Sequence, residues 1–120
     1  MMYEITVKKS FSSAHFLRDH KGPCKNVHGH NWMVEASFAS VKLDDLGMVV
    51  DFEDASKELS RVTCMLDHKL INEVPPFDVE NPTAEKIAEW IFVQLEKNLP
   101  VTPSRVTVFE TDSSSASYAG

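Results

Sequence analysis

Hydrophobic and polar positions alternate along the first segment of the chain, residues 3–16. Tyr3, Ile5 and Val7 share one parity, and the same parity continues as far as His15. Side chains two residues apart on a strand point to the same face, so the pattern predicts a long, half-buried strand. We expect a strand of this length to bend or to contain a bulge.

A second alternating segment runs from about residue 27 to residue 40. One of its faces carries His28, His30, Trp32, Val34, Ala36 and Phe38, and the other is mostly polar. The two histidines therefore extend an apolar face, which places them at the edge of a core. Residues 44–47 then predict a turn, and residues 48–50 predict a short strand or a strand end.

Two further segments have the spacing of amphipathic helices. Asp51 can cap the first helix, and Cys64, within its apolar pattern, is interpreted as a small core residue. The second helix is expected to open at Asn81-Pro82, because proline at a first-turn position needs no donor, and to end at Pro100. The apolar stripe of the first helix consists of Phe52, Ala55, Leu59, Val62 and Leu66.

The C-terminal part of the chain predicts two more strands, at residues 104–111 and 115–118. The order ββααββ predicts an α+β class with an antiparallel sheet, in a chain of 120 residues that forms one domain over 1–120. Two helices cover only one face of such a sheet. Because the open face and edges need a partner, we expect a homo-oligomer.

The charge balance limits the partners of the chain. Lys and Arg number 12 against 18 Asp and Glu, a formal net charge of -6, which argues against nucleic-acid binding. There is no apolar run long enough to span a membrane and no charged-then-apolar leader, so a cytoplasmic protein without membrane contact is expected. Arg18, Lys21 and Lys25 form either a locally positive field or a solvated loop.

Three of the five histidines lie close to a cysteine, in the segment that contains His28-Gly29-His30. Neutral imidazole binds zinc well, and two histidines on one strand face can reach one ion. Antiparallel pairing of the first two strands brings His15 to the same face, which makes it the natural third ligand. His20, in the polar loop, is the weaker substitute.

Cys24 allows two interpretations. As a thiol of lowered pKa it acts as a general base beside the metal. As a fourth ligand it closes a Cys-His₃ site, which stabilises the fold but performs no chemistry. The spacing leaves both open, and two cysteines do not make a disulfide framework.

Two carboxylates are further candidates. Asp67 precedes His68, and the pair is either a proton relay or a capping histidine beside a surface acid; adjacent side chains converge only if the backbone turns there. Glu110 stands on the strand face of Val106 and Val108, where an apolar residue is expected. It is either an exposed strand end or an acceptor of two parallel hydrogen bonds from a flat heterocycle.

Six short motifs together resemble one family, that of the 6-pyruvoyl-tetrahydropterin and 6-carboxytetrahydropterin synthases, and the resemblance covers nearly the whole chain. The motifs are Phe11-Ser12-Ser13-Ala14-His15, Cys24-x-x-x-His28-Gly29-His30-Asn31, Gly47-Met48-Val49-Val50-Asp51-Phe52, Leu66-Asp67-His68, Asn81-Pro82-Thr83-Ala84-Glu85 and Glu110-Thr111.

The resemblance implies the tunnelling fold, in which the sheets of several subunits join into a barrel, as a hexamer of two trimers with active sites shared between subunits. It implies one zinc ion per subunit, catalysis by Cys24 with Asp67 and His68 as relay partners, and Glu110 as both pterin anchor and relay member. The implied zinc ligands are His15, His28 and His30.

The resemblance also implies an activity, that of a zinc-dependent lyase acting on a pterin triphosphate. Three residues between Cys24 and His28 resemble the 6-carboxytetrahydropterin synthases of queuosine biosynthesis. These convert 7,8-dihydroneopterin triphosphate into 6-carboxy-5,6,7,8-tetrahydropterin, acetaldehyde and triphosphate. The alternatives are a 6-pyruvoyl product, formed without carbon–carbon cleavage, and a non-catalytic, zinc-stabilised binding module.

Overall fold

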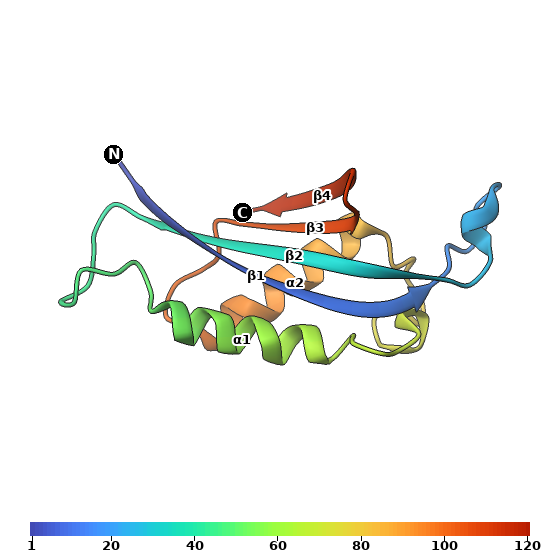
Figure 1. Ribbon diagram of the computed structural model, residues 1–120, viewed down its shortest axis with the longest axis horizontal. Coiled ribbons are helices and arrows are strands. Elements are labelled where there is room, and N and C mark those ends of the chain that lie inside the picture. The colour runs from blue at the N-terminus through green and yellow to red at the C-terminus, as the bar shows by residue number, and fades with distance from the viewer.

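The computed structural model describes all 120 residues and confirms the predicted ββααββ order (Figure 1). Two short 3₁₀ turns, Pro23–Lys25 and Ile71–Glu73, interrupt the connections. The strands form one antiparallel sheet of order β1-β2-β3-β4, as the α+β class requires. The elements are β1 (Tyr3–His15), β2 (His28–Ser40), α1 (Phe52–Cys64), α2 (Ala84–Asn98), β3 (Arg105–Thr111) and β4 (Ser114–Ala119).

The β1–β2 hairpin sets the geometry of the molecule. The two strands pair without a register shift from Tyr3 opposite Ser40 to His15 opposite His28. Of the two expected irregularities, a bend or a bulge, the bulge is absent and the ribbon of β1 bends smoothly along its length (Figure 1). Because the register is unbroken, the side-chain parity set at the first residues is preserved to the end of the hairpin.

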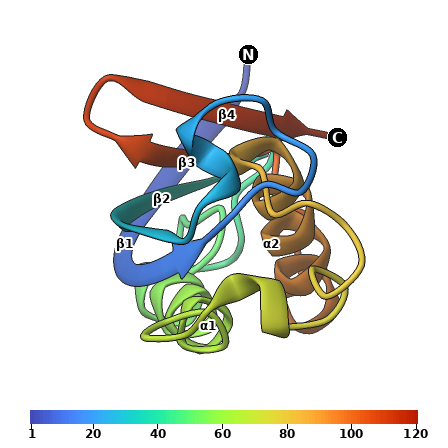
Figure 2. The same cartoon turned by 90° about the vertical axis from the view of Figure 1, so that its right-hand side faces the viewer.

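Both helices cover the same face of the sheet, as Figure 2 shows from the end of the molecule. The core between the layers contains the inward side chains of β2, such as Trp32 and Phe38, against Leu59 of α1 and Ile91 of α2, all of them fully buried. The indole N–H of Trp32 donates to the carbonyl of Ser13 across the hairpin, at 3.1 Å. This bond fixes Trp32 at the end of the core that lies next to the histidines.

The first helix begins where the sequence predicts, because the Asp51 side chain accepts from the backbone N–H of Glu53 at 2.7 Å. The second helix begins later than expected, at Ala84, with Thr83 as its N-cap. The prediction that it opens at Asn81-Pro82 was wrong, since the Thr83 hydroxyl captures the free backbone N–H of Lys86. Pro82 therefore lies before the cap.

Three further expectations were wrong. Residues 48–50 form a bend and not a strand, although Val49 and Val50 are buried. Phe52 is 59% exposed because it is the first residue of α1 and lines an open surface pocket beside the start of β1. Cys64 is exposed because it follows Leu59 by five positions, which at about 100° per residue turns it away from the apolar stripe. None of the helices has both the length and the apolar composition needed to cross a membrane.

Candidate metal centre

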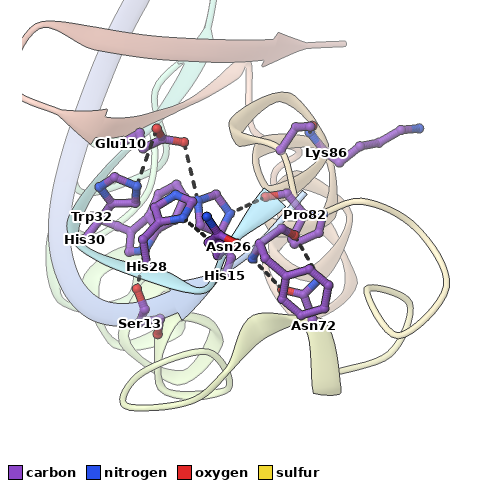
Figure 3. A network of polar contacts seen from close by, with 12 residues as sticks. Ser13, His15, Asn26, His28, His30, Trp32, Asn72, Pro82, Lys86 and Glu110 are labelled. Atoms are coloured by element: carbon purple, nitrogen blue, oxygen red, sulfur yellow. Dashed lines mark hydrogen bonds and ion pairs between the residues drawn. The ribbon is translucent and has the colours of Figure 1, made fainter. Parts of the chain in front are cut away.

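Three imidazoles meet at one end of the β1–β2 hairpin. His15 is the last residue of β1 and faces His28, the first residue of β2, while His30 follows on the same face. One ligand atom from each ring lies within 4.8 Å of the other two. His15 is therefore the third member of the cluster, and His20 is not part of it. Figure 3 shows the three rings turned toward one another.

Backbone carbonyls orient two of the rings. Nδ1 of His15 lies 2.8 Å from the carbonyl oxygen of Pro82, and Nδ1 of His28 lies 2.8 Å from that of Asn26. A carbonyl oxygen can only accept, so each Nδ1 carries the hydrogen and donates it. The lone pair of each ring is then on Nε2, the usual arrangement for a histidine that binds a metal.

Two of the nitrogens have no hydrogen-bond partner although they are buried. These are Nε2 of His15 and Nε2 of His30. A buried polar atom without a partner destabilises the fold, so the structure indicates a missing ligand at this point. A divalent cation bound by three imidazole nitrogens would satisfy both atoms, and the donor set suits zinc with an open coordination position. The residues present fit such an ion.

Burial controls the protonation of the same two rings. Desolvation is the largest influence on His15 and on His30 and holds the pKa of each below its ordinary value of 6.5, whereas the nearby Glu110 carboxylate raises it. The rings are therefore neutral near pH 7. Neutral imidazole is the form that binds a metal.

The metal-free protein is expected to lose stability on acidification. Unfolded histidines take up protons near pH 6.5, whereas folded His15 and His30 resist them, so the unfolded state binds more protons below that pH. Their contribution to the free energy of unfolding is complete above pH 6.5 and is lost as the pH falls. Urea unfolding of the chelated protein between about pH 5 and 8 measures this slope. A free energy that rises on acidification would contradict the assignment, and His30→Gln should reduce the slope.

Glu110 stands beside the cluster at the end of β3. It shares a face with the buried Val106 and Val108, and its carboxylate lies 3.5 Å from Nε2 of His30 and 3.7 Å from Nε2 of His15 (Figure 3). The side chain is 29% exposed and also borders a cavity of about 340 Å³ near the start of α2. A carboxylate is thus available to a ligand that enters next to the imidazoles.

Cys24 lies in the first 3₁₀ turn, half-buried and unpaired with Cys64. The convergent ligand atoms come from the three histidines alone and do not include its sulfur. The thiol also makes no hydrogen bond. This geometry does not support the closed Cys-His₃ site, because the sulfur stands outside the group of ligand atoms.

The carboxylate and ring of the Asp67-His68 pair do meet. His68 has a φ of 56°, which turns the backbone and brings its Nδ1 to 3.0 Å from the Asp67 carboxylate. The backbone N–H of Ser12 donates to the other Asp67 oxygen at 2.9 Å, and these contacts, that of Ser12 first, hold the pKa of Asp67 below its usual range. The His68 side chain is 82% exposed, and its polar contact is with Asp67 rather than with Cys24. One chain therefore forms the pair without joining it to the thiol.

Sequence reasoning missed several residues that hold the site in place. The Pro82 carbonyl that orients His15 has no side-chain signal, because any residue carries a carbonyl. The sequence indicates only a charged loop residue at Arg18. In the structure its guanidinium donates to the carbonyls of Phe77 at 2.8 Å and Glu80 at 3.0 Å. The side-chain amides of Asn72 and Asn81, which bond the backbone of Phe16 and Arg18, are also not predicted by the sequence pattern. Lys21 and Lys25 remain exposed on the loop, as a solvated loop would have them.

Comparison with known proteins points in one direction. The sequence profile of the 6-pyruvoyl tetrahydropterin synthase family matches residues 4–120. The 6-carboxy-5,6,7,8-tetrahydropterin synthase of Synechocystis is 37% identical over 98% of this chain and 93% of its own length. The 6-pyruvoyl tetrahydrobiopterin synthase of Dictyostelium discoideum is 31% identical over 97% of this chain and 95% of its own length.

Among solved structures, the 6-pyruvoyl tetrahydropterin synthase of Caenorhabditis elegans superimposes with a TM-score of 0.89. It is 27% identical and the match covers 100% of this chain and 96% of that one. The four-stranded antiparallel sheet with two helices on one face is thus the tunnelling fold that the motifs imply.

Proposed function

This chain belongs to the 6-pyruvoyl tetrahydropterin synthase family, and from that premise we propose that it is a zinc-dependent 6-carboxy-5,6,7,8-tetrahydropterin synthase. Its reaction converts 7,8-dihydroneopterin triphosphate into 6-carboxytetrahydropterin, acetaldehyde and triphosphate. The proposal is carried by one observation, the convergence of three imidazoles, two of which have a buried Nε2 without a partner. The three-residue spacing from Cys24 to His28 and the Synechocystis relative favour the carboxy product.

The zinc ion, one per subunit, would be held by His15, His28 and His30. When bound, it supplies Lewis acidity that stabilises developing oxyanions on the hydroxyls of the substrate side chain. The backbone carbonyls of Pro82 and Asn26 keep two of the rings in the tautomer that binding requires.

Cys24, as the thiolate, removes the proton from the carbon of the pterin side chain and later returns it. Asp67 and His68 control the protonation of the thiol, because the carboxylate fixes the ring through Nδ1 and leaves Nε2 available. Glu110 accepts hydrogen bonds from the pterin ring and so places the reacting carbon at the thiol.

A shared site explains why His68 is exposed and makes no contact with Cys24 in one chain. We place the Asp67-His68 pair of one subunit against Cys24 of another, in a hexamer of two trimers. The outer side of β4, and that of β1 before Ser12, carry no further strand, which leaves both available to join sheets between subunits. The protein so assembled is one domain per chain, over residues 1–120, and works in the cytoplasm without nucleic acid or membrane.

The second candidate is a 6-pyruvoyl-tetrahydropterin synthase, favoured by the Dictyostelium relative and the Caenorhabditis structure. It uses the same residues but leaves the carbon–carbon bond intact. Incubating the zinc-loaded protein with 7,8-dihydroneopterin triphosphate and analysing products by mass distinguishes the two. Acetaldehyde with 6-carboxytetrahydropterin supports the carboxy synthase, whereas 6-pyruvoyl-tetrahydropterin without acetaldehyde supports the second candidate. If the folded, zinc-loaded hexamer releases no triphosphate, both enzyme activities are excluded and the protein is a zinc-stabilised binding module.

Glu110→Gln is expected to weaken substrate binding more than it slows turnover. The change keeps the shape of the side chain but removes the charge that strengthens hydrogen bonds from the ring, so KM should rise by about 10- to 100-fold. Steady-state kinetics separate KM from kcat. Glu96→Gln is the matched control, since Glu96 is an exposed acid on α2. An unchanged KM in Glu110→Gln would contradict the anchor role.

A further inference from the structure

Two asparagine side chains hold the segment that follows His15. Asn72 accepts from the backbone N–H of Phe16 and donates to the Phe16 carbonyl, both at 2.9 Å. Asn81 accepts from the N–H of Arg18 at 2.8 Å and donates to the Arg18 carbonyl at 3.0 Å. Each amide thus bonds both polar groups of one residue, as a residue on a neighbouring strand does. Phe16 and Leu17 thus continue the chain beyond the end of β1, and Arg18 enters a turn in which the N–H of His20 donates to the carbonyl of Leu17 at 3.3 Å.

The residue between the two tethered positions connects to Cys24. The N–H of Leu17 donates to the carbonyl of Cys24 at 2.8 Å. The asparagines therefore bond Phe16 and Arg18, and Cys24 bonds the residue between them. The position of the cysteine therefore follows the position of this segment.

Few other contacts locate the cysteine. Its 3₁₀ turn has no side-chain cap, and the turn's other backbone bonds, Lys25 to Gly22 and Asn26 to Pro23, are internal to it. The thiol itself is free of hydrogen bonds. Leu17 is thus the link by which the turn is attached to the rest of the molecule on its N-terminal side.

The same tether reaches the metal cluster. Asn81 is followed by Pro82, whose carbonyl accepts from Nδ1 of His15. Asn72 is 5% exposed, so its bonds to Phe16 are protected from water. Asn81 therefore bonds Arg18, next to the residue that bonds Cys24, and the adjacent Pro82 bonds a ring of the metal cluster.

From these contacts we infer that Asn72 and Asn81 are positioning residues for Cys24. They set the distance between its thiol and the three imidazoles by holding residues 16–18 in place. The inference rests on the proposed function, in which Cys24 moves a proton beside the metal. A proton-transfer group displaced by about 1 Å can lose about 10²-fold in rate, so such a tether has a direct kinetic consequence.

Asn81→Ala in the zinc-loaded, full-length protein tests the inference. The variant is treated briefly with iodoacetamide, and alkylation of Cys24 is compared with that of Cys64 by mass analysis of the peptides. Cys64 is exposed at the end of α1 and serves as an internal reference. The Cys24 to Cys64 ratio should rise by about fivefold or more, because a released turn exposes its thiol more often. At the same time kcat should fall by about 10- to 100-fold, with KM and zinc content unchanged.

Asn98→Ala is the matched control, because its amide bonds only Glu58 on the surface, at 3.1 Å. Asn81→Asp keeps the acceptor for Arg18 but loses the donor, so an intermediate ratio is expected, and this variant decides if Asn81→Ala fails to fold. A ratio and kcat equal to those of Asn98→Ala would overturn the inference. If the wild type has no pterin turnover, the proposed function fails, but a raised ratio still supports the tether and an unchanged one still overturns it.

Discussion

Cys24→Ala is expected to lower turnover by about 10²–10⁴-fold, the usual effect of removing an acid–base group. The bound zinc should stay, because the convergent ligand atoms come from His15, His28 and His30 and not from the sulfur. Substrate affinity should also stay, since Glu110 and the imidazoles are untouched. Turnover by steady-state kinetics, zinc by elemental analysis and substrate affinity by calorimetry give the three readouts.

Cys64→Ala provides the control for the same chemical change at the other thiol. Cys64 is exposed on α1 and has no part in the proposed reaction, so its variant should keep full turnover. Loss of zinc in Cys24→Ala would identify the cysteine as a ligand and would remove the open coordination position from the mechanism. Full turnover in Cys24→Ala would assign the proton transfer to another group.

The second large effect is expected from His28→Ala. Two imidazoles remain, and zinc affinity should fall by more than the roughly 10- to 100-fold typical of losing an outer hydrogen-bond partner. His28 is only half-buried, so the fold should tolerate the change better than replacement of His15, which is 1% exposed. Zinc content after dialysis should drop from about one ion per subunit to nearly none, and turnover with it.

His20→Ala is the matched control for the loss of one imidazole. His20 is exposed, and its Nδ1 accepts from the N–H of Gly22 within the loop, away from the cluster. This variant should keep both zinc and turnover. Full zinc occupancy in His28→Ala would mean that the ion sits elsewhere, and the proposed site would then be wrong.

The fold was largely predictable because its periodicities are simple. The parity that begins at Tyr3 persists to His15, and the register pairs it with His28 as the alternation requires. The Asp51 cap places the start of α1 for a local reason, a carboxylate that accepts a free backbone N–H. Such features depend on neighbours in sequence, and therefore they can be found without the structure.

The wrong expectations concern residues whose burial or pairing depends on which other segments of the chain lie against them. Phe52 follows the stripe of α1 but lines an open pocket beside the start of β1, so water reaches it. The bend at residues 48–50 buries Val49 and Val50 without any strand pairing. Periodicity indicates which face a residue occupies, but it does not indicate what covers that face.

The Asp67-His68 pair shows the same limit within the site. The two residues can be found by type, but adjacent side chains converge only through the left-handed backbone at His68. Ser12 holds both residues: its carbonyl accepts from the backbone N–H of His68, and its own N–H donates to the Asp67 carboxylate, 55 residues away in sequence. In the proposed function the pair meets a thiol only in the assembled protein, and no local pattern along the chain encodes that contact.

By itself the sequence determined the order of strands and helices, the face on which the histidines lie and the identity of the chemical groups, because these follow from residue type and period. Only the tertiary structure decided that His15 and not His20 joins the cluster, that two Nε2 atoms are left unsatisfied, and that the Pro82 carbonyl and the Asn72 and Asn81 amides hold the site. These contacts join segments more than 50 residues apart, and their geometry depends on how the layers pack rather than on any pattern along the chain.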